Sequence, residues 1–380
     1  MSLKEEALEL HRKYKGKLEI ISKIPLKTRE DLSLAYTPGV AFACQEIAAN
    51  KEKVYEYTFK GRFVAIVTDG SAVLGLGNIG AEASLPVMEG KAQLFKEFGG
   101  VDAFPIALKT QDTEEIIKIV KNISPVFGGI NLEDISAPRC FEIEERLINE
   151  LDIPVFHDDQ HGTAIVVLAG LTNALKLANK KIDEIRIVIN GAGAAGMAVA
   201  KILFSAGAKN IILLDSRGII WDGREEGMNK VKEEMAKITN LEKIKGGLNE
   251  AVKEADVFIG VSQPNILSKE MVRGMADNPI IFAMANPVPE IMPDEAREAG
   301  ANLIATGRSD FPNQINNVLA FPGLFKGVLE NRIKKITMEM KLSAARALAD
   351  YITEPTPEYF IPGVFDKGVA DIVARAVNTK

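Results

Sequence analysis

Cysteine is scarce in this chain of 380 residues, which contains only Cys44 and Cys140. The two form neither a CxxC pair nor a zinc-binding spacing, so we expect no disulfide framework and a reducing, cytoplasmic environment. Long apolar runs are also missing, because no stretch approaches the ~18 residues that span a membrane. The segment 1–17 is charged throughout, and it does not have the apolar core of a secretory signal.

Basic clusters are missing as well, and the formal net charge is -6. This balance argues against nucleic acid or an anionic membrane as a partner. Hydrophobic residues make up 47% and charged residues 26% of the chain, which is typical of a soluble globular protein. The length predicts two domains.

Short β-rich runs alternate with helical patterns, which predicts an α/β fold with parallel strands. The predicted strands of a first series lie at 62–70, 102–108, 126–134 and 153–159, and its helices at 81–98, 112–122, 137–151 and 163–178. A second series of predicted strands lies at 185–190, 211–215, 255–262, 279–286 and 301–307. We therefore predict a catalytic α/β domain with a parallel sheet at 1–162, a Rossmann-type dinucleotide-binding domain at 163–330, and a helical segment at 331–380 that packs back on the domains.

Two segments match the pattern GxGxxG, and their surroundings distinguish them. Gly191–Gly196 follows a β-branched strand and opens directly into an apolar helix, whereas Gly75–Gly80 lies several residues beyond its strand. Asp215 ends the next strand 24 residues after Gly191, where an acid can accept the ribose 2′-hydroxyl. The residues predicted to bind the dinucleotide are Gly191, Gly193, Ala194, Ala195, Gly196 and Asp215.

The acid at position 215 predicts a preference for NAD, because a 2′-phosphate would meet a like charge there. Arg217 lies two residues further on and would favour NADP, so we expect measurable activity with NADP as well. The loop at 75–80 is interpreted as a segment whose glycines let backbone approach a ligand.

Acidic residues gather at the predicted carboxyl ends of three strands. Asp69 ends the first strand, Glu133 and Asp134 end the third, and Asp158 and Asp159 end the fourth. Ligands bind beyond the carboxyl ends of parallel strands, and like charges gather there at low cost only around a cation. Oxygen donors suit Mg²⁺ or Mn²⁺, so we predict a metal site at Glu133, Asp134 and Asp159.

Capping of helices is the alternative role for these acids, because Asp134 precedes a helix predicted at Ala137 and Asp159 precedes one at Thr163. Capping accounts for one acid at each helix but not for the Glu-Asp and Asp-Asp pairs. We interpret the neighbouring His157 and His161 as turn residues or as groups that orient the ligands, outside the metal shell.

Lys91 falls on the apolar stripe of the helix predicted at 81–98. A lysine buried in this way titrates low and can serve as a base, whereas the alternative is a side chain that follows the helix surface to water. Tyr36 precedes a Thr-Pro-Gly turn, and Asn286 ends a strand. Packing or turn formation competes with ligand contact as the role of both residues.

Eight segments, in order along the chain, resemble the malic enzyme family in its short bacterial and archaeal form. They are YTPGVAFACQEI (36–47), VTDGSAVLGLGNIG (67–80), EGKAQLF (89–95), GGINLEDI (128–135), VFHDDQHGTA (155–164), INGAGAAG (189–196), ANPVPEI (285–291) and NNVLAFPG (316–323). The resemblance implies oxidative decarboxylation of (S)-malate to pyruvate and CO₂, with reduction of NAD or NADP. It also implies a requirement for Mg²⁺ or Mn²⁺ and a homodimer or larger homo-oligomer.

The resemblance implies roles for single residues. Lys91 matches the family's general base, Tyr36 its general acid, and Asp158 the acid that pairs with the lysine. The family's metal ligands match Glu133, Asp134 and Asp159, and its substrate-binding asparagines match Asn286, which is also expected to contact the cofactor, and Asn317.

One position departs from the family, because longer members carry a substrate-binding arginine where this chain has Ala72. Backbone amides of the loop at 75–80 are our candidate replacement. Two alternative functions are an oxidoreductase without a metal, similar to amino-acid dehydrogenases, and an inactive scaffold that senses the cofactor. Metal-dependent turnover would distinguish both from the expected activity.

Overall fold

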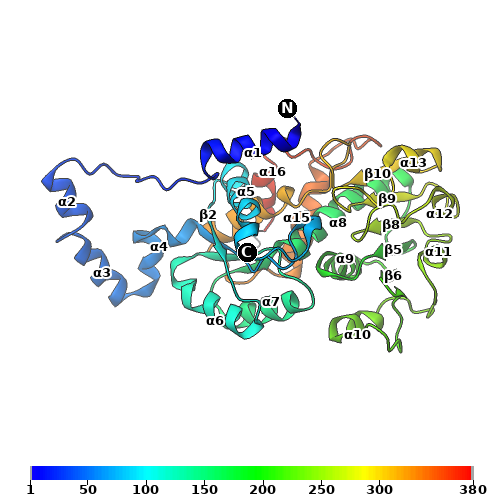
Figure 1. Ribbon diagram of the computed structural model, residues 1–380, viewed down its shortest axis with the longest axis horizontal. Coiled ribbons are helices and arrows are strands. Elements are labelled where there is room, and N and C mark those ends of the chain that lie inside the picture. The colour runs from blue at the N-terminus through cyan, green and yellow to red at the C-terminus, as the bar shows by residue number, and fades with distance from the viewer. Residues whose placement is uncertain (1, 378–380) are drawn as a thin grey trace.

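Two sheets of mainly parallel strands, joined by a long helix, form the body of the molecule in the computed structural model (Figure 1). The structure describes residues 2–377, apart from the side chain of Leu74. Met1 and residues 378–380, the end of the predicted segment 331–380, lie outside the described residues. All nine predicted strands are present, and the predicted α/β class with a parallel-sheet domain and a Rossmann-type domain is confirmed.

The first sheet has the strand order β2-β1-β3-β4, and all its strands are parallel. Its strands are β1 (Phe63–Thr68), β2 (Asp102–Ala107), β3 (Gly129–Leu132) and β4 (Val155–His157). The connecting helices are α5 (Ala81–Gly99), α6 (Thr113–Ile123) and α7 (Arg139–Glu150). Helices cover both faces, which is why β1 and β3 are almost continuously apolar and buried. Parallel pairing brings the carboxyl ends of β1, β3 and β4 to one edge.

The second sheet has the order β10-β9-β8-β5-β6-β7, in which β7 alone is antiparallel. Its strands are β5 (Arg186–Asn190), β6 (Asn210–Asp215), β7 (Gly218–Ile219), β8 (Val257–Gly260), β9 (Ile280–Ala283) and β10 (Leu303–Thr306). The surrounding helices are α9 (Ala194–Ser205), α10 (Lys230–Ala236), α11 (Leu248–Ala251), α12 (Lys269–Arg273) and α13 (Pro293–Glu298). Strand order reverses between β5 and β8, the place where such sheets bind nucleotides.

The helix α8 (Asp158–Ala178) begins five residues earlier than the sequence predicts, so Asp158 and Asp159 lie in its first turn. The helix can begin at Asp158 because Gly162 leaves room for the Asp158 side chain. A Cβ at Gly162 would lie 1.9 Å from Asp158 Oδ1. The interpretation of Asp134 and Asp159 as helix caps is wrong. The N-cap of α8 is His157 and that of α7 is Pro138, and neither side chain makes a capping hydrogen bond.

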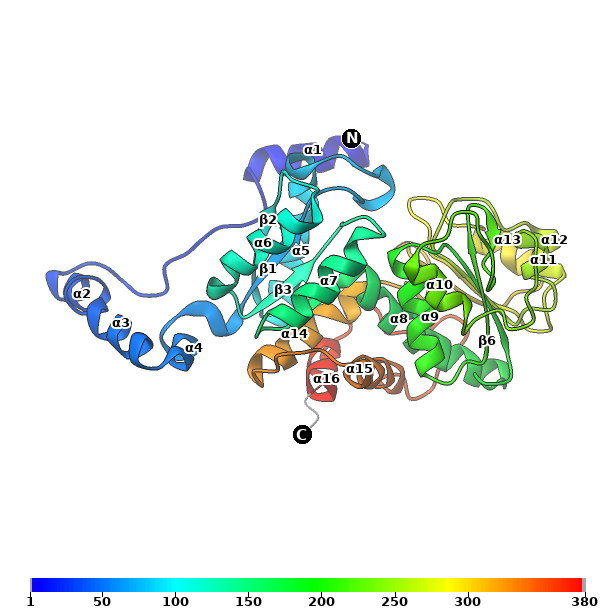
Figure 2. The same cartoon turned by 90° about the horizontal axis from the view of Figure 1, so that it is seen from below.

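Among the described residues, α8 is the one helix long and apolar enough to cross a bilayer, with a mean hydropathy of 1.2 over its most apolar window. That window is 67% buried inside the protein, between α9 and the C-terminal helix α15 (Met338–Asp350). The apolar residues of α8 therefore form part of the hydrophobic core between the two sheets (Figure 2).

The chain returns to the first sheet at its C-terminal end. Helix α14 (Phe321–Glu330) packs on α5, and α16 (Val369–Ala376) packs on α14. The ring centroid of Phe325 lies 5.3 Å from that of Phe95 and 5.9 Å from that of Phe156. These aromatic contacts join segments that are far apart in the sequence. The predicted domain limits of 1–162, 163–330 and 331–380 remain a prediction.

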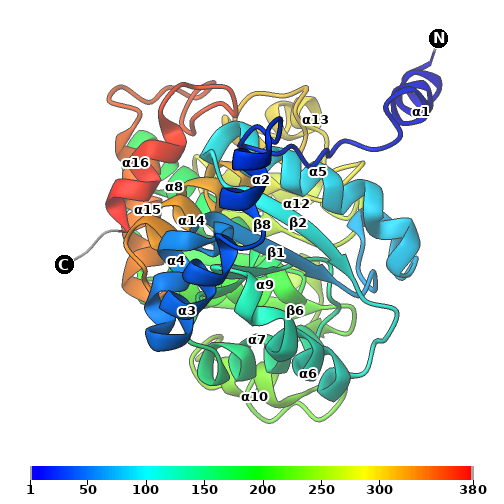
Figure 3. The ribbon, with the colours of Figure 1, turned by 90° about the vertical axis from the view of Figure 1, so that its left-hand side faces the viewer.

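An arm projects from the body at the N-terminal end (Figures 1 and 2). It contains α2 (Arg29–Ala35), α3 (Val40–Ala49) and α4 (Val54–Tyr57), and no residue of these helices is buried in the described chain. Figure 3 looks along the arm onto the first sheet. The preceding helix α1 (Leu3–Tyr14) is tied back to the body just beyond its end, where the backbone N–H of Lys17 donates to Glu89 Oε2 at 3.0 Å.

Replacement of Phe325 by alanine tests the packing of α14 on the first sheet. We expect Phe325→Ala to lower the free energy of unfolding by about 3–5 kcal/mol, because it removes a fully buried ring from an aromatic cluster. Phe365→Ala is the matched control, since Phe365 is 87% exposed and its loss should cost less than about 0.5 kcal/mol. Urea titration measures both, and equal losses would contradict this packing.

Candidate active site

Three carboxylates converge at the carboxyl edge of the first sheet. Glu133 and Asp134 follow β3 and are buried, and Asp159 lies half-buried in the first turn of α8. One oxygen from each lies within 4.8 Å of the other two. Asp134 takes a left-handed φ of 54°, and its backbone N–H donates to Asp159 Oδ2 at 2.8 Å. The donor set is oxygen only, so these residues fit a hard divalent cation such as Mg²⁺ or Mn²⁺.

Lys91 lies beside this cluster with 7% of its side chain exposed. Its Nζ lies 2.6 Å from Asp158 Oδ2 and 2.8 Å from Glu133 Oε1, and 4.3 Å from the ring centroid of Phe321. The side chain therefore does not follow the helix to water. The ammonium group of Lys91, on α5, thus contacts a residue of α8 and a residue of the segment after β3.

The charge state of Lys91 differs from the expectation. Burial by itself would lower the pKa of Lys91, but the charges of Asp158 and Glu133 outweigh it and raise the pKa above its ordinary value. The sequence shows the apolar stripe around Lys91 but not the two carboxylates that other elements bring to it. Burial raises the pKa of Asp158 to about 6 and also raises that of Glu133, each against the effect of Lys91.

Asp158 links Lys91 to the second half of the chain. Its Oδ2 accepts hydrogen bonds from Lys91 Nζ and from the side-chain amide of Asn317, at the start of the short helix η5 (Asn317–Leu319). Asn317, expected to bind substrate, thus contacts the partner of the proposed base. Asn286 is exposed on the loop after β9, and a Cβ at Gly75 would lie 2.8 Å from its backbone carbonyl oxygen.

The glycine loop at 75–80 is the candidate replacement for the missing arginine at Ala72. The amides of Ile79 and Gly80 both donate to the carbonyl of Gly70 at 3.1 Å, and these bonds hold the loop closed. Gly70 requires its glycine, because its φ is 66° and a Cβ there would lie 2.2 Å from Gly80 O. Only the other backbone N–H groups of the loop could therefore bind a ligand.

Tyr36 is not brought to this cluster within a single chain. It follows α2 in the projecting arm, and 65% of the residue is exposed. Figures 1 and 2 show that α2 and α3 extend away from the body, whereas α5, which carries Lys91, packs against the first sheet.

Glu144 is a buried residue of the site that the sequence analysis missed. It accepts hydrogen bonds from the backbone N–H of His157 at 2.8 Å, from Gln160 Nε2 at 3.2 Å and from His161 Nε2 at 2.9 Å. These bonds fix the turn that leads into α8. A signal existed, because Glu144 interrupts the buried face of α7 formed by Cys140, Ile143 and Leu147.

Arg139 is a second residue that the sequence did not indicate, and its side chain binds the loop after β1. Its Nη1 lies 2.9 Å from Asp69 Oδ2, and its Nη2 donates to Ser71 Oγ at 3.0 Å and to Ser136 Oγ at 3.1 Å. Asp69, at the end of β1, is thus engaged by this arginine. Arg139 therefore connects the loops that follow β1 and β3.

The glycine motif of the second sheet forms the expected strand-to-helix turn. Gly191 has a φ of 123°, and a Cβ at Gly196 would lie 1.7 Å from Gly191 O. Gly193 is the N-cap of α9 and provides no side-chain cap, and Ala194 and Ala195 open the helix. The helix N-terminus therefore fits a pyrophosphate group. Asp215 ends β6 as predicted, and its side chain is paired with Arg224 and Lys232.

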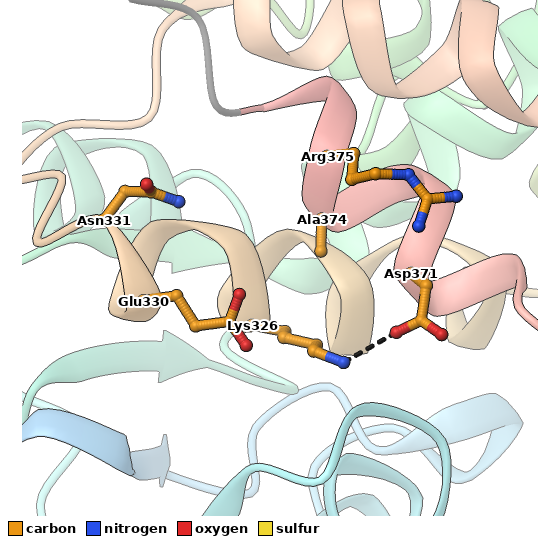
Figure 4. A pocket seen from close by; sticks show the side chains of 6 residues that line it. All are labelled: Lys326, Glu330, Asn331, Asp371, Ala374 and Arg375. Atoms are coloured by element: carbon orange, nitrogen blue, oxygen red, sulfur yellow. Dashed lines mark hydrogen bonds and ion pairs between the residues drawn. The ribbon is translucent and has the colours of Figure 1, made fainter.

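A separate surface hollow of about 240 Å³ lies between α14 and α16 (Figure 4). Its lining is mostly charged, and Lys326 Nζ lies 2.6 Å from Asp371 Oδ1 across it. The lining residues are Lys326, Glu330, Asn331, Asp371, Ala374 and Arg375. None of the residues predicted to form the active site lines this hollow.

Two family models match consecutive parts of the chain. The N-terminal domain of malic enzyme matches residues 15–148, and the NAD-binding domain of malic enzyme matches residues 160–378. The two matches together cover most of the chain: the first contains β1, β2 and β3, and the second contains all the strands of the second sheet.

Individual relatives agree with the family models. The bifunctional malic/malolactic enzyme of Bacillus subtilis is 60% identical over 99% of this chain and 92% of its own. The NAD-dependent malic enzyme of Geobacillus stearothermophilus is 60% identical over 95% of this chain and 76% of its own. A crystal structure of the NAD-dependent malic enzyme of Thermotoga maritima, 54% identical, superimposes with a TM-score of 0.95 over 98% of both chains. The chain therefore belongs to the malic enzyme family.

Proposed function

We propose that this protein oxidises (S)-malate at C2 and releases its C4 carboxylate as CO₂, which leaves pyruvate, while NAD or NADP is reduced. The observation that carries the proposal is Lys91, buried between Asp158 and the carboxylate Glu133 of the cluster. Glu133 both contacts the proposed base and belongs to the proposed metal site, and a base beside a metal site suits the oxidation of a hydroxy acid. Relatives named as NAD- and NADP-dependent malic enzymes support the same activity.

Glu133, Asp134 and Asp159 would hold the divalent cation, because their oxygens gather at one point. A cation bound there supplies Lewis-acid chemistry, which polarises the C2 oxygen of malate and stabilises enolate charge. An oxidoreductase without a metal has no need for this cluster. An inactive, cofactor-sensing scaffold has no need for the buried pair of Lys91 and Asp158. Both alternatives are therefore less well supported.

Lys91 would accept the proton of the C2 hydroxyl. Glu133, as a proposed metal ligand, would share its charge with a cation bound there, which would weaken its hold on the Lys91 ammonium and favour the neutral lysine that a base requires. Asp158 keeps the lysine oriented and is itself fixed by Asn317. Lys91 thus stays in place while its charge changes.

The dinucleotide supplies the hydride acceptor, and this chain's residues position it. Gly191 and Gly196 let the backbone approach the pyrophosphate, and the N-terminus of α9 offers free amides to it. Asn286 lies on the loop that meets Gly75, where the two halves of the chain come together. We infer that Asn286 contacts both the cofactor and the substrate at this junction.

The arm would bind a second copy of the chain and place Tyr36 in the partner's active site, where its hydroxyl protonates C3 of the enolate. Support comes from the arm's exposed apolar side chains, which are unusual for a monomer. Examples are Leu34 (77% exposed) in α2 and Phe42 (67%) in α3, and Ile20 (86%) and Ile21 (74%) in the segment that leads to α2. The functional unit is therefore a homodimer or a larger assembly, and the free cysteines are compatible with the cytoplasm.

Lys91→Met tests the base. We expect malate oxidation with Mn²⁺ and NAD or NADP, followed at 340 nm, to fall by about 10²- to 10⁴-fold. Binding of the cofactor, measured by calorimetry, should be unchanged, which also shows that the variant is folded. Lys96→Met on the same helix is the control, because that side chain is 59% exposed. Wild-type turnover by Lys91→Met would refute the assignment.

Asp159→Asn tests the metal site. We expect the variant to bind Mn²⁺ roughly tenfold or more weakly in an electron paramagnetic resonance titration, because one of three carboxylates is lost. Asp152→Asn should bind like the wild type, since its side chain is 95% exposed and outside the cluster. Excess EDTA should stop turnover. Full activity in EDTA would mean that no divalent cation takes part.

Subunit mixing tests the location of Tyr36. Tyr36→Phe and Lys91→Met should each be inactive alone. After dissociation and random reassembly, a dimer with Tyr36 donated between subunits regains about a quarter of wild-type activity, because half of the dimers are mixed and each has one intact site. Recovery near zero would place Tyr36 in its own chain's site.

A further inference from the structure

A buried carboxylate joins two loops at the carboxyl edge of the second sheet. Glu290 lies between β9 and α13 and is fully buried. Its Oε1 accepts a hydrogen bond from the backbone N–H of Ser262, and its Oε2 accepts one from the backbone N–H of Ala285, both at 3.0 Å. Ser262 follows β8 and Ala285 follows β9, so one side chain connects the ends of two adjacent strands. We call this connection the Glu290 clamp.

The surrounding main chain makes room for the carboxylate and fixes it. A Cβ at Gly260, the last residue of β8, would lie 2.3 Å from Glu290 Cδ, so any other residue there would displace the side chain. The backbone of Glu290 is held as well, because its carbonyl accepts from the N–H of Leu267 at 3.0 Å. The carbonyl of Pro289 accepts from the N–H of Asn265 at the same distance. The geometry of the clamp is therefore well determined.

The charge of Glu290 is buried without a cation beside it. Within residues 2–377, its carboxylate is paired with backbone N–H groups and with no lysine, arginine or histidine side chain. Burial raises the pKa of Glu290 against the opposing effect of these N–H groups. A glutamine would provide a single acceptor oxygen and would turn an NH₂ group toward the second N–H donor. Two donors from two loops therefore explain why an acid is used here.

The loop after β9 carries Asn286, the residue proposed to contact both malate and the cofactor. Asn286 directly follows Ala285, so the bond from Ala285 to Glu290 fixes the backbone next to it. The side chain of Asn286 lies close to the end of β10, because a Cβ at Gly307 would lie 2.7 Å from its Nδ2. The orientation of Asn286 therefore depends on a loop that the Glu290 clamp holds.

The loop after β8 is the firmly anchored side of the clamp. The N–H of Val261 donates to the carbonyl of Asn190 at 2.9 Å, and Ser262 Oγ accepts from Asn190 Nδ2 at 2.6 Å. Asn190 is the last residue of β5, at the centre of the sheet. These bonds do not depend on Glu290, so loss of the clamp would release mainly the loop that carries Asn286.

We propose that Glu290 is a positioning residue for the oxidation of malate, because its carboxylate fixes the loop after β9 and so determines where Asn286 presents its side chain. This inference rests on the proposed function, in which Asn286 contacts the reacting molecules. Glu290 is itself fully buried and acts through the loop. Displacement of a substrate-contacting group by even a fraction of its length lowers the rate, because the reacting atoms are then held in the wrong geometry.

A double-mutant cycle tests the connection between Glu290 and Asn286. Glu290→Gln and Asn286→Ala are measured singly and together, by kcat/KM for malate with Mn²⁺ and NAD. We expect each single variant to lose about 10- to 100-fold. The double variant should lose little more than Asn286→Ala alone, because the clamp has no effect once the side chain that it positions is gone. Glu295→Gln is the control and should match the wild type, since Glu295 is exposed on the neighbouring α13.

Amide hydrogen exchange of the full-length protein gives a second measurement that does not require turnover. In Glu290→Gln, peptides from residues 284–291 should exchange about tenfold faster or more, because Ala285 loses its acceptor. Peptides from β5 should exchange as in the wild type, which shows that the variant is folded. Glu290→Asp shortens the side chain by one methylene and replaces Glu290→Gln in both measurements if the glutamine variant does not fold.

Three results would overturn the proposal. They are a wild-type kcat/KM in Glu290→Gln, an equal loss on adding Glu290→Gln to the wild type and to Asn286→Ala, and unchanged exchange at 284–291. The second result would make Glu290 a purely structural residue. Failure of the proposed function looks different. A wild type that does not oxidise malate, combined with faster exchange at 284–291 in Glu290→Gln, would refute the reaction and leave the Glu290 clamp in place.

Discussion

The buried ammonium of Lys91 is the interaction on which the rest of the active site depends. A charge removed from water is tolerated only when it is paired, and Lys91 is paired with Asp158 and Glu133, which come from different elements. The packing of α5, α8 and the segment after β3 is therefore restricted to arrangements that keep the three groups together. Gly162 and Asn317 belong to the same restriction, since one makes room for Asp158 and the other donates to it.

Clusters of mixed charge recur at both proposed ligand sites. At the first sheet a lysine lies against acids of the proposed metal site, and at the second sheet two cations lie against Asp215. In each case charged side chains of the protein itself compensate the charge of the residues that we propose to bind a ligand. The side chains are held in position in advance, so less ordering is needed when a ligand binds.

Much of the fold was predictable, because strands and glycine turns depend on local sequence. The acids after β1 and β3 were placed correctly for the same reason, since parallel strands end at one edge. The start of α8, the charge of Lys91 and the engagement of Asp215 were not predictable. Each depends on contacts between distant residues, such as Lys91 with Asp158, which are 67 positions apart, or Asp215 with Lys232, 17 positions apart.

Helix α8 gives the molecule a mechanical property. Its first turn carries Asp158 and Asp159, and its body packs against α9 of the second sheet. The two sheets are thus connected by one continuous helix rather than by a flexible linker. Asp158 directly follows β4 of the first sheet and begins α8, so a rotation of the nucleotide-binding half would act on the first turn of α8, where Asp158 pairs with Lys91 of α5. Movement between the halves and the strength of the lysine–aspartate pair are therefore coupled through one continuous helix.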